Sequence, residues 1–313
     1  MKTDMPALVA ALKKKREAEG LSIRALSERI GVSFSSLARI ERGEGEPDNN
    51  SAIRIIEWLG DDARDAGLSF ESVALVHFRA GKNVRAKTVH CLLKAADRIK
   101  TNHRSSGAEF LASQQTESEL APSIALSKTE MEEMAQQLRK DLGVAPDDGI
   151  ESLDIKIAGV EVFLVSKIEG LRPDCSDFLL GEGAQEWSAM SVPLDFAEDT
   201  WAILRNDTHT LERQRVTYLE ECWHILLGHR LTRIAKIADA YGRTYESSEE
   251  HDAFYLAAAT LLPEAAVRTA IEGGDDATKI GKRFGASVEL VEYRIKRLGL
   301  WRTYKDKTVS LEN

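Results

Sequence analysis

Residues 220–224 combine side chains that can bind a metal ion and take a proton from water. The five residues read Glu-Glu-Cys-Trp-His. On a helix, the first and last of them lie one turn apart on the same face, so Glu220 and His224 can hold one cation between them. In the pattern H-E-x-x-H both of these positions are histidine, and the glutamate between them acts as a general base. Glu220 therefore stands where a histidine is usual, and Glu221 is the candidate base.

The helix that carries these residues has recognisable start and stop signals. Asp207 or Thr208 can cap its first turn, and Gly228 can end it in a left-handed conformation. Cys222 would then point away from the ligand face and into the core. His229, on the far side of the glycine, is expected either behind the ligands or at the surface.

A second helix is predicted downstream, where residues 250–263 read EHDAFYLAAATLLP. Residues 213–219 read RQRVTYL, and residues 224–229 read HILLGH. In this order and spacing, these segments resemble the ImmA/IrrE family of metallo-endopeptidases over about residues 126–300. The resemblance implies a zincin-like α+β domain that binds zinc. It implies His224 and Glu250 as metal ligands, Glu220 in the place of the first ligand and Glu221 as the catalytic base, with Asp252 as a less favoured substitute for Glu250.

Glutamate in the place of the first histidine changes the expected chemistry. The carboxylates of Glu220 and Glu250 would cancel the charge of a divalent cation, so zinc would lower the pKa of its water less than it does beside two imidazoles. Oxygen ligands also shift the preference toward Mn²⁺ or Fe²⁺. Three outcomes stay open at this point: a zinc site, a site for manganese or iron, and no metal at all.

Short helices joined by tight turns are predicted between residues 7 and 60. Ser22, Ser33 and either Asp48 or Asn50 can cap successive helices, and Gly31 suits the turn of a helix-turn-helix. Residues 21–33 (LSIRALSERIGVS), followed by LARIERG, resemble the Cro-like (XRE) repressor family over about 55 residues. The resemblance implies an all-α helix-turn-helix domain that binds double-stranded DNA.

The helix that Ser33 begins is the one expected in the major groove. By position, the base-facing residues are Ser33, Phe34, Ser35, Ser36 and Arg39, and the residues that hold phosphates are Lys13, Lys15, Arg24 and Arg42. Serine discriminates poorly between bases, and Ile23 replaces a glutamine that contacts DNA in many members. The first sixty residues hold ten basic and nine acidic residues, so one copy should bind weakly and a homodimer is expected on DNA. The alternative is a four-helix packing module without a role on DNA.

Residues 72–101 are predicted to be helical, and the stretch from Arg79 to Arg104 carries eight basic residues against one acidic residue. This stripe is either a solvated helix face or a second DNA contact. Residues 102–125 have the composition of a linker. Beyond it, a capping box at Ser127 and Glu130 predicts a helix to about Leu142. Strands are predicted at 160–165, 177–180, 187–192 and 201–205.

Residues 278–298 repeat the pattern of the first helix-turn-helix. We expect this C-terminal unit to pack on the preceding domain rather than to contact DNA.

Composition is typical of a globular protein, with 43% hydrophobic and 30% charged residues and a net charge of −9. No run approaches the roughly 18 apolar residues of a membrane span, and the N-terminus lacks a secretory signal, so a cytoplasmic protein without membrane contact is expected. The three cysteines, Cys91, Cys175 and Cys222, are an odd number without a C-x-x-C pair. This pattern argues against a disulfide framework and for reduced, mostly buried thiols.

We therefore expect a multidomain protein, with an all-α helix-turn-helix domain, an α+β metallopeptidase-like domain and a helical C-terminal unit. The expected boundaries are 1–68 for the helix-turn-helix domain, 69–125 for the connector and linker, 126–265 for the metallopeptidase-like domain and 266–313 for the C-terminal unit. The leading hypothesis is a DNA-binding transcriptional regulator that cleaves itself or a partner repressor. One alternative is a non-catalytic regulator whose degenerate cleft senses a ligand or a partner protein. In a second alternative, the helix-turn-helix only docks the substrate of an active peptidase.

Overall fold

A computed structural model describes the protein at residues 5–60, 62–63, 72–80, 84–105, 126–195, 198–229, 232–237, 240–243 and 247–305. It divides into two compact units: the first comprises residues 1–76 and 231–245, and the second comprises residues 77–230 and 246–313. The linker expected at 102–125 lies outside the described residues from residue 106 onward.

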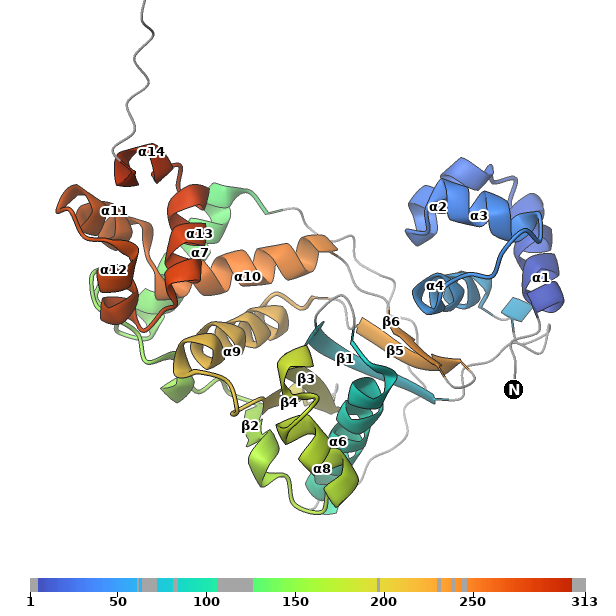
Figure 1. Ribbon diagram of the computed structural model, residues 1–313, viewed down its shortest axis with the longest axis horizontal. Coiled ribbons are helices and arrows are strands. Elements are labelled where there is room, and N and C mark those ends of the chain that lie inside the picture. Colours follow the sequence, from blue (N-terminus) through green and yellow to red (C-terminus); the bar gives the residue numbers. More distant parts are fainter. Residues whose placement is uncertain are drawn as a thin grey trace, which may run out of the picture. The chain divides into compact units, whose positions relative to one another are not determined.

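The first unit contains the expected helix-turn-helix. Its described helices are α1 (Met5–Ala18), α2 (Ile23–Ile30), α3 (Phe34–Glu41) and α4 (Asn49–Leu59) (Figure 1). Ser22 accepts a hydrogen bond from the backbone of Ala25 at 3.1 Å, and Ser33 accepts one from Ser36 at 3.2 Å. Gly31, between α2 and α3, has a left-handed backbone with φ of 65°. The fully buried core of the unit includes Leu8, Leu12, Leu26, Leu37, Ile40 and Ile55.

Strands complete the first unit. The described strands are β1 (Ser72–Ala80), β5 (Thr232–Ile237) and β6 (Ala240–Arg243). Residues 72–76 of β1 pair antiparallel with β5, and β5 pairs antiparallel with β6. Helix α4 packs against this hairpin.

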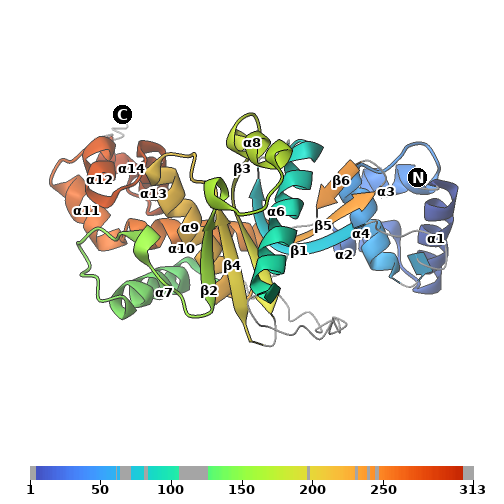
Figure 2. The same ribbon diagram turned by 90° about the horizontal axis from the view of Figure 1, so that it is seen from below.

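The second unit is built on a mixed sheet between two layers of helices. Its other strands are β2 (Val160–Leu164), β3 (Trp187–Asp195) and β4 (Thr200–Arg205). Strand β2 runs parallel to β4, whereas β3 is antiparallel to β4 and to residues 77–80 of β1. Helices α9 (Leu211–Leu226) and α10 (Ser247–Leu261) lie on one side of the strands, and α6 (Ala86–Ser105) and α8 (Pro173–Leu180) lie on the other (Figure 2). Helix α9 packs directly on β3 and β4.

The remaining helices of the second unit share a core with α10. They are α7 (Lys128–Asp141), α11 (Glu264–Glu272), α12 (Ala277–Phe284), α13 (Val288–Arg297) and α14 (Trp301–Tyr304). Short 3-10 helices stand at η1 (Ser152–Asp154), η2 (Val165–Lys167) and η3 (Ala184–Glu186). The capping box predicted at the start of α7 is present, because Ser127 and Glu130 each accept a hydrogen bond from the other's backbone. The core joins α7 and α10 to the C-terminal helices, so these helices belong to the same folded body.

Three predictions of local structure are wrong. Residues 72–80 form strand β1 rather than the start of a helix, and residues 177–180 are the end of helix α8 rather than a strand. Pro173 begins α8, a position that proline favours, and the three-residue apolar run at 178–180 suits either structure. The third wrong prediction is the cap of α9, which was expected at Asp207 or Thr208. The cap is Thr210, whose side chain accepts a hydrogen bond from the backbone N–H of Arg213. Asp207 instead accepts hydrogen bonds from the backbone and side chain of Ser166.

The basic face of α6 has partners within its own unit. Arg85 forms an ion pair with Glu186, and its guanidinium lies 4.8 Å from the ring centre of Phe178. The ammonium of Lys87 lies 4.3 Å from the same ring centre, and Arg98 donates to a backbone carbonyl at 3.1 Å. The basic residues at 79, 82 and 104 have side chains outside the described part of the chain. Contacts within the second unit therefore account for three members of the basic stripe, Arg85, Lys87 and Arg98.

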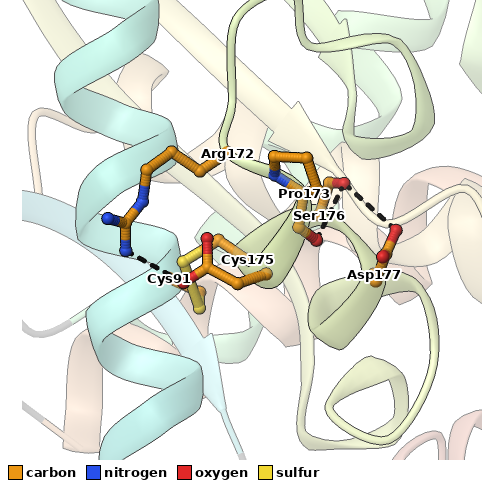
Figure 3. The surroundings of a disulfide bond; sticks show 7 residues. Cys91, Arg172, Pro173, Cys175, Ser176 and Asp177 are labelled. Carbon is orange, nitrogen blue, oxygen red and sulfur yellow. Dashed lines mark hydrogen bonds and ion pairs between the residues drawn. A yellow bond between two sulfur atoms is a disulfide. The ribbon is translucent and has the colours of Figure 1, made fainter.

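A disulfide bond also joins α6 to α8, which overturns the expectation of reduced cysteines. It links Cys91 to Cys175, whose Cα atoms lie 5.0 Å apart (Figure 3). Both residues are buried, and the third cysteine, Cys222, is a free buried thiol. The partners are separated by 84 residues in sequence, so only the packing of the two helices reveals the pair.

Reduction of this disulfide is expected to lower the free energy of unfolding by about 2 to 4 kcal/mol, because the bond restricts the unfolded chain. Urea unfolding with and without reductant measures this difference. Cys91→Ser should abolish the effect of the reductant, whereas Cys222→Ala should preserve it. Equal midpoints for the wild-type protein under both conditions would show that the bond contributes nothing to stability.

None of the described helices has the length and apolar character needed to span a bilayer.

Candidate metal centre and nucleic-acid interface

Helices α9 and α10 lie side by side because α10 presents small side chains to its neighbours (Figure 1). Ala253, Ala257 and Ala258 are fully buried, and alanine lets two helix backbones approach closely. Trp223 of α9 donates a hydrogen bond to the hydroxyl of Thr260 on α10 at 3.1 Å, which fixes their alignment. On another face of α9, His224 lies beside Glu250 in the first turn of α10.

Three side chains meet at this junction. Glu220, His224 and Glu250 each offer a ligand atom, and these atoms all lie within 4.8 Å of one another. His224 Nε2 is 3.8 Å from Glu250 Oε1. Glu220 is 1% exposed and His224 is 2% exposed, whereas the side chain of Glu250 retains 25% of its exposure. The structure thus brings together the three residues proposed as ligands from the sequence, with an opening on the Glu250 side.

This donor set fits a divalent cation. Ligands at about 2.1 Å from a tetrahedral zinc ion lie roughly 3.4 Å from one another. The separation of 3.8 Å between His224 and Glu250 is close to this value and exceeds a hydrogen bond. Glu220 and Glu221 are both fully buried, which concentrates negative charge where burial is costly. A cation at this point would balance that charge.

The candidate base is held by a residue that the sequence did not indicate. Ser191 of β3 donates a hydrogen bond from its hydroxyl to Glu221 Oε2, and both residues are 0% exposed. A hydroxyl donor fixes the orientation of a carboxylate and favours its ionised form. The available signal was one of two serines within a mostly apolar strand, and such residues are common without a role in a site.

The other residues near the cluster have distinct environments. His229 Nδ1 lies 3.0 Å from His224 Nδ1, and burial lowers the pKa of His229 to about 4. Cys222 is 1% exposed, and burial raises its pKa to about 12, so it stays an inert thiol in the core. Asp252, the alternative third ligand, is not part of the converging cluster among the described residues.

In the first unit, α3 presents an exposed face made by the residues proposed to contact bases. Phe34 is 49% exposed, which is unusual for a large apolar side chain. Ser35 and Arg39 are exposed as well. The hydroxyl of Ser33 accepts from Ser36 N and contacts Ser36 Oγ at 2.8 Å, so capping occupies it. Phe34, Ser35 and Arg39 are therefore the side chains most available to a DNA groove.

The residues proposed to hold phosphates divide into two groups. Lys13 and Arg24 are exposed, and Arg24 lies 5.8 Å from the ring centre of Phe34. Arg42 is exposed and forms an ion pair with Glu44 at 2.8 Å. Lys15 donates to a carbonyl at the end of α4 at 3.0 Å, so its ammonium is engaged within the domain. Lys15 is therefore less available to a phosphate than Lys13 or Arg24.

Helices α12 and α13 repeat the local geometry of α2 and α3. Asp276 and Ser287 cap them, and Gly285 between them is left-handed with φ of 63°. However, Arg294 of the second helix is 0% exposed and forms a two-point ion pair with Glu132 of α7 at 2.5 and 2.6 Å. Arg294, a basic residue of this second helix-turn-helix, therefore serves packing between α13 and α7, in agreement with the packing expected of the C-terminal unit.

Comparison with protein families agrees with both parts of this description. Residues 12–60 match the family model described as Helix-turn-helix, and residues 188–296 match the model described as IrrE N-terminal-like domain. The first match contains all the proposed DNA contacts, and the second contains the candidate ligands and base. No curated protein and no solved structure matches the chain.

Proposed function

We propose that this chain, which joins an XRE-type helix-turn-helix domain to an IrrE-like domain, is a DNA-binding transcriptional regulator with metal-dependent endopeptidase activity. The substrate is a partner repressor or the chain itself. The observation that carries the proposal is the convergence of Glu220, His224 and Glu250 beside a buried carboxylate, Glu221. The cation is zinc or, because two of the three ligands are carboxylates, manganese or iron.

The roles of the residues follow from their positions. Glu220, His224 and Glu250 would hold the cation, which supplies Lewis acidity toward water or a peptide carbonyl. Glu221 would take the proton of the attacking water, because it adjoins the ligands and its second oxygen is already held by Ser191. Partial exposure of Glu250 leaves a route for a peptide to approach.

Metal analysis of the purified full chain tests the first step of this proposal. The wild-type protein is expected to retain about one divalent cation per chain, because three ligands and one open position suit a catalytic site. His224→Ala should lose the metal, because it removes the imidazole ligand. His251→Ala is the matched control, since His251 adjoins Glu250 but contacts Arg297. Equal metal content in wild type and His224→Ala would contradict the proposed site.

The DNA-binding role of the first unit has its own test. Phe34→Ala is expected to weaken binding to a duplex selected by the wild-type protein, with a loss of about 1 to 3 kcal/mol. Val288→Ala is the matched control, because Val288 follows the cap of α13 as Phe34 follows the cap of α3 and is 40% exposed. Titration by fluorescence anisotropy measures both variants. Equal effects of the two substitutions would count against α3 as the recognition helix.

A non-catalytic regulator is the alternative that the exchange at Glu220 favours. In that case the region around Glu220, His224 and Glu250 would bind a ligand or a partner protein. This binding would shift the affinity of the helix-turn-helix domain for DNA. Substitution of Glu221 would then leave regulation intact, whereas occupation of this region would alter DNA binding.

A further inference from the structure

The strongest unassigned contact at the candidate metal centre joins two histidines. The Nδ1 atoms of His224 and His229 lie 3.0 Å apart. Their rings meet edge to face, with centroids 5.0 Å apart and planes inclined by 71°. His224 Nε2, at the opposite end of the imidazole, is the atom that lies 3.8 Å from Glu250 Oε1. The ligand thus has one nitrogen toward the cluster and the other toward His229.

The backbone at the C-terminal end of α9 brings His229 beside His224. Gly228 has a left-handed backbone with φ of 61°, which reverses the chain immediately after the helix. The backbone N–H of His229 then donates to the carbonyl of His224 at 3.0 Å. This closing bond returns His229 to the turn that contains His224. The pairing therefore comes from a helix-ending motif and not from a mobile loop.

The hydrogen on His224 Nδ1 determines which histidine donates in this contact and which one accepts. A neutral imidazole that coordinates a cation through Nε2 carries its hydrogen on Nδ1. His224 Nδ1 then donates to His229 Nδ1, which must accept with a lone pair and carry its own hydrogen on Nε2. Because a hydrogen bond between two nitrogens needs one donor and one acceptor, this tautomer of His229 locks the metal-binding tautomer of His224.

We propose that His229 is a positioning residue that holds His224 with Nε2 directed toward Glu250 and the cation site; the proposal rests on the metal site proposed above. Such outer partners of a ligating histidine are usually carboxylates, carbonyls or water. A third carboxylate here would add negative charge to a site that already has Glu220 and Glu250 as ligands. A neutral imidazole supplies the same geometry without that charge, so it suits the chain that has glutamate in place of the first histidine.

The test compares affinity for Co²⁺ and Zn²⁺ in chelator competition, using the full chain. His229→Ala is expected to weaken binding by about 10- to 100-fold. His229→Gln should restore most of the affinity, because its amide oxygen can accept from His224 Nδ1. His251→Ala should leave the affinity unchanged. The visible absorption bands of bound Co²⁺ should change in His229→Ala and return in His229→Gln.

Failure of this inference and failure of the metal site give different results. A wild-type chain that binds neither ion, or a His224→Ala variant that binds as well as wild type, overturns the site itself and this inference with it. Loss of binding in His224→Ala together with unchanged affinity in His229→Ala overturns only the role of His229. Nitrogen-15 NMR of the metal-loaded wild-type protein is a second reading that needs no variant. Protons on His224 Nδ1 and His229 Nε2 support the inference, and the reverse assignment overturns it.

Discussion

Glu221→Gln is expected to reduce peptide cleavage by the metal-loaded protein by about 10²- to 10⁴-fold, the usual contribution of a general base. Glutamine has nearly the same shape as glutamate but cannot take a proton from water. Ser191 can still donate to the amide oxygen of the new side chain, so the fold around β3 and α9 should persist. Metal content should also persist, because Glu221 is not one of the three converging ligands.

Cleavage is best followed by mass spectrometry of the full chain, alone and with a candidate repressor, after addition of Zn²⁺, Mn²⁺ or Fe²⁺. Glu212→Gln is the matched control, since it makes the same chemical change in the first turn of α9. A variant Glu221→Gln that cleaves as fast as wild type would remove Glu221 from the mechanism. A wild-type protein that cleaves nothing with any of these metals would favour the non-catalytic regulator.

The convergence of Glu220, His224 and Glu250 could be anticipated because its geometry is largely local. Glu220 and His224 share a helix face by spacing alone, and the resemblance in sequence supplied Glu250. Its side chain reaches the other two because α10 is rich in alanine and packs closely on α9. The helix caps at Ser22 and Ser33 could also be predicted from the sequence. A serine before an apolar periodic segment caps the helix by accepting a hydrogen bond from a nearby backbone N–H.

Several features that could not be anticipated depend on distant partners. Ser191 meets Glu221 only because β3 lies under α9, thirty residues away in sequence. Cys91 and Cys175 meet because α6 packs on α8. The segment that forms β1 was assigned to a helix, because its pairing with β3 and β5 is a property of the folded sheet. These contacts between elements required the folded structure, whereas the contact of Glu250 with α9 could be expected from the family resemblance.

Glu132→Ala is expected to lower the free energy of unfolding of the second unit by about 3 to 5 kcal/mol, the usual cost of leaving one member of a buried ion pair alone. Arg294 is 0% exposed, and its two outer nitrogens both donate to Glu132. Its Nε donates to the carbonyl of Leu262 at 2.8 Å, and the hydroxyl of Tyr255 also donates to Glu132 at 2.6 Å. Loss of the carboxylate would leave a buried guanidinium without its counter-charge.

The same pair gives stability a defined dependence on pH. Burial alone would raise the pKa of Glu132, but the hydrogen bonds and charge of Arg294 outweigh it and hold this pKa below its ordinary value. A carboxyl with a lowered pKa stabilises the folded state above its unfolded pKa, and this contribution disappears as the pH falls through the folded pKa. Urea unfolding from neutral to acidic pH should therefore show a loss of stability in wild type that is smaller in Glu132→Ala. Glu133→Ala, which changes an exposed neighbour on α7, should follow wild type throughout. If Glu132→Ala were as stable as wild type at neutral pH, Arg294 would not anchor α13 to α7, and the C-terminal helix-turn-helix would be free to serve another role.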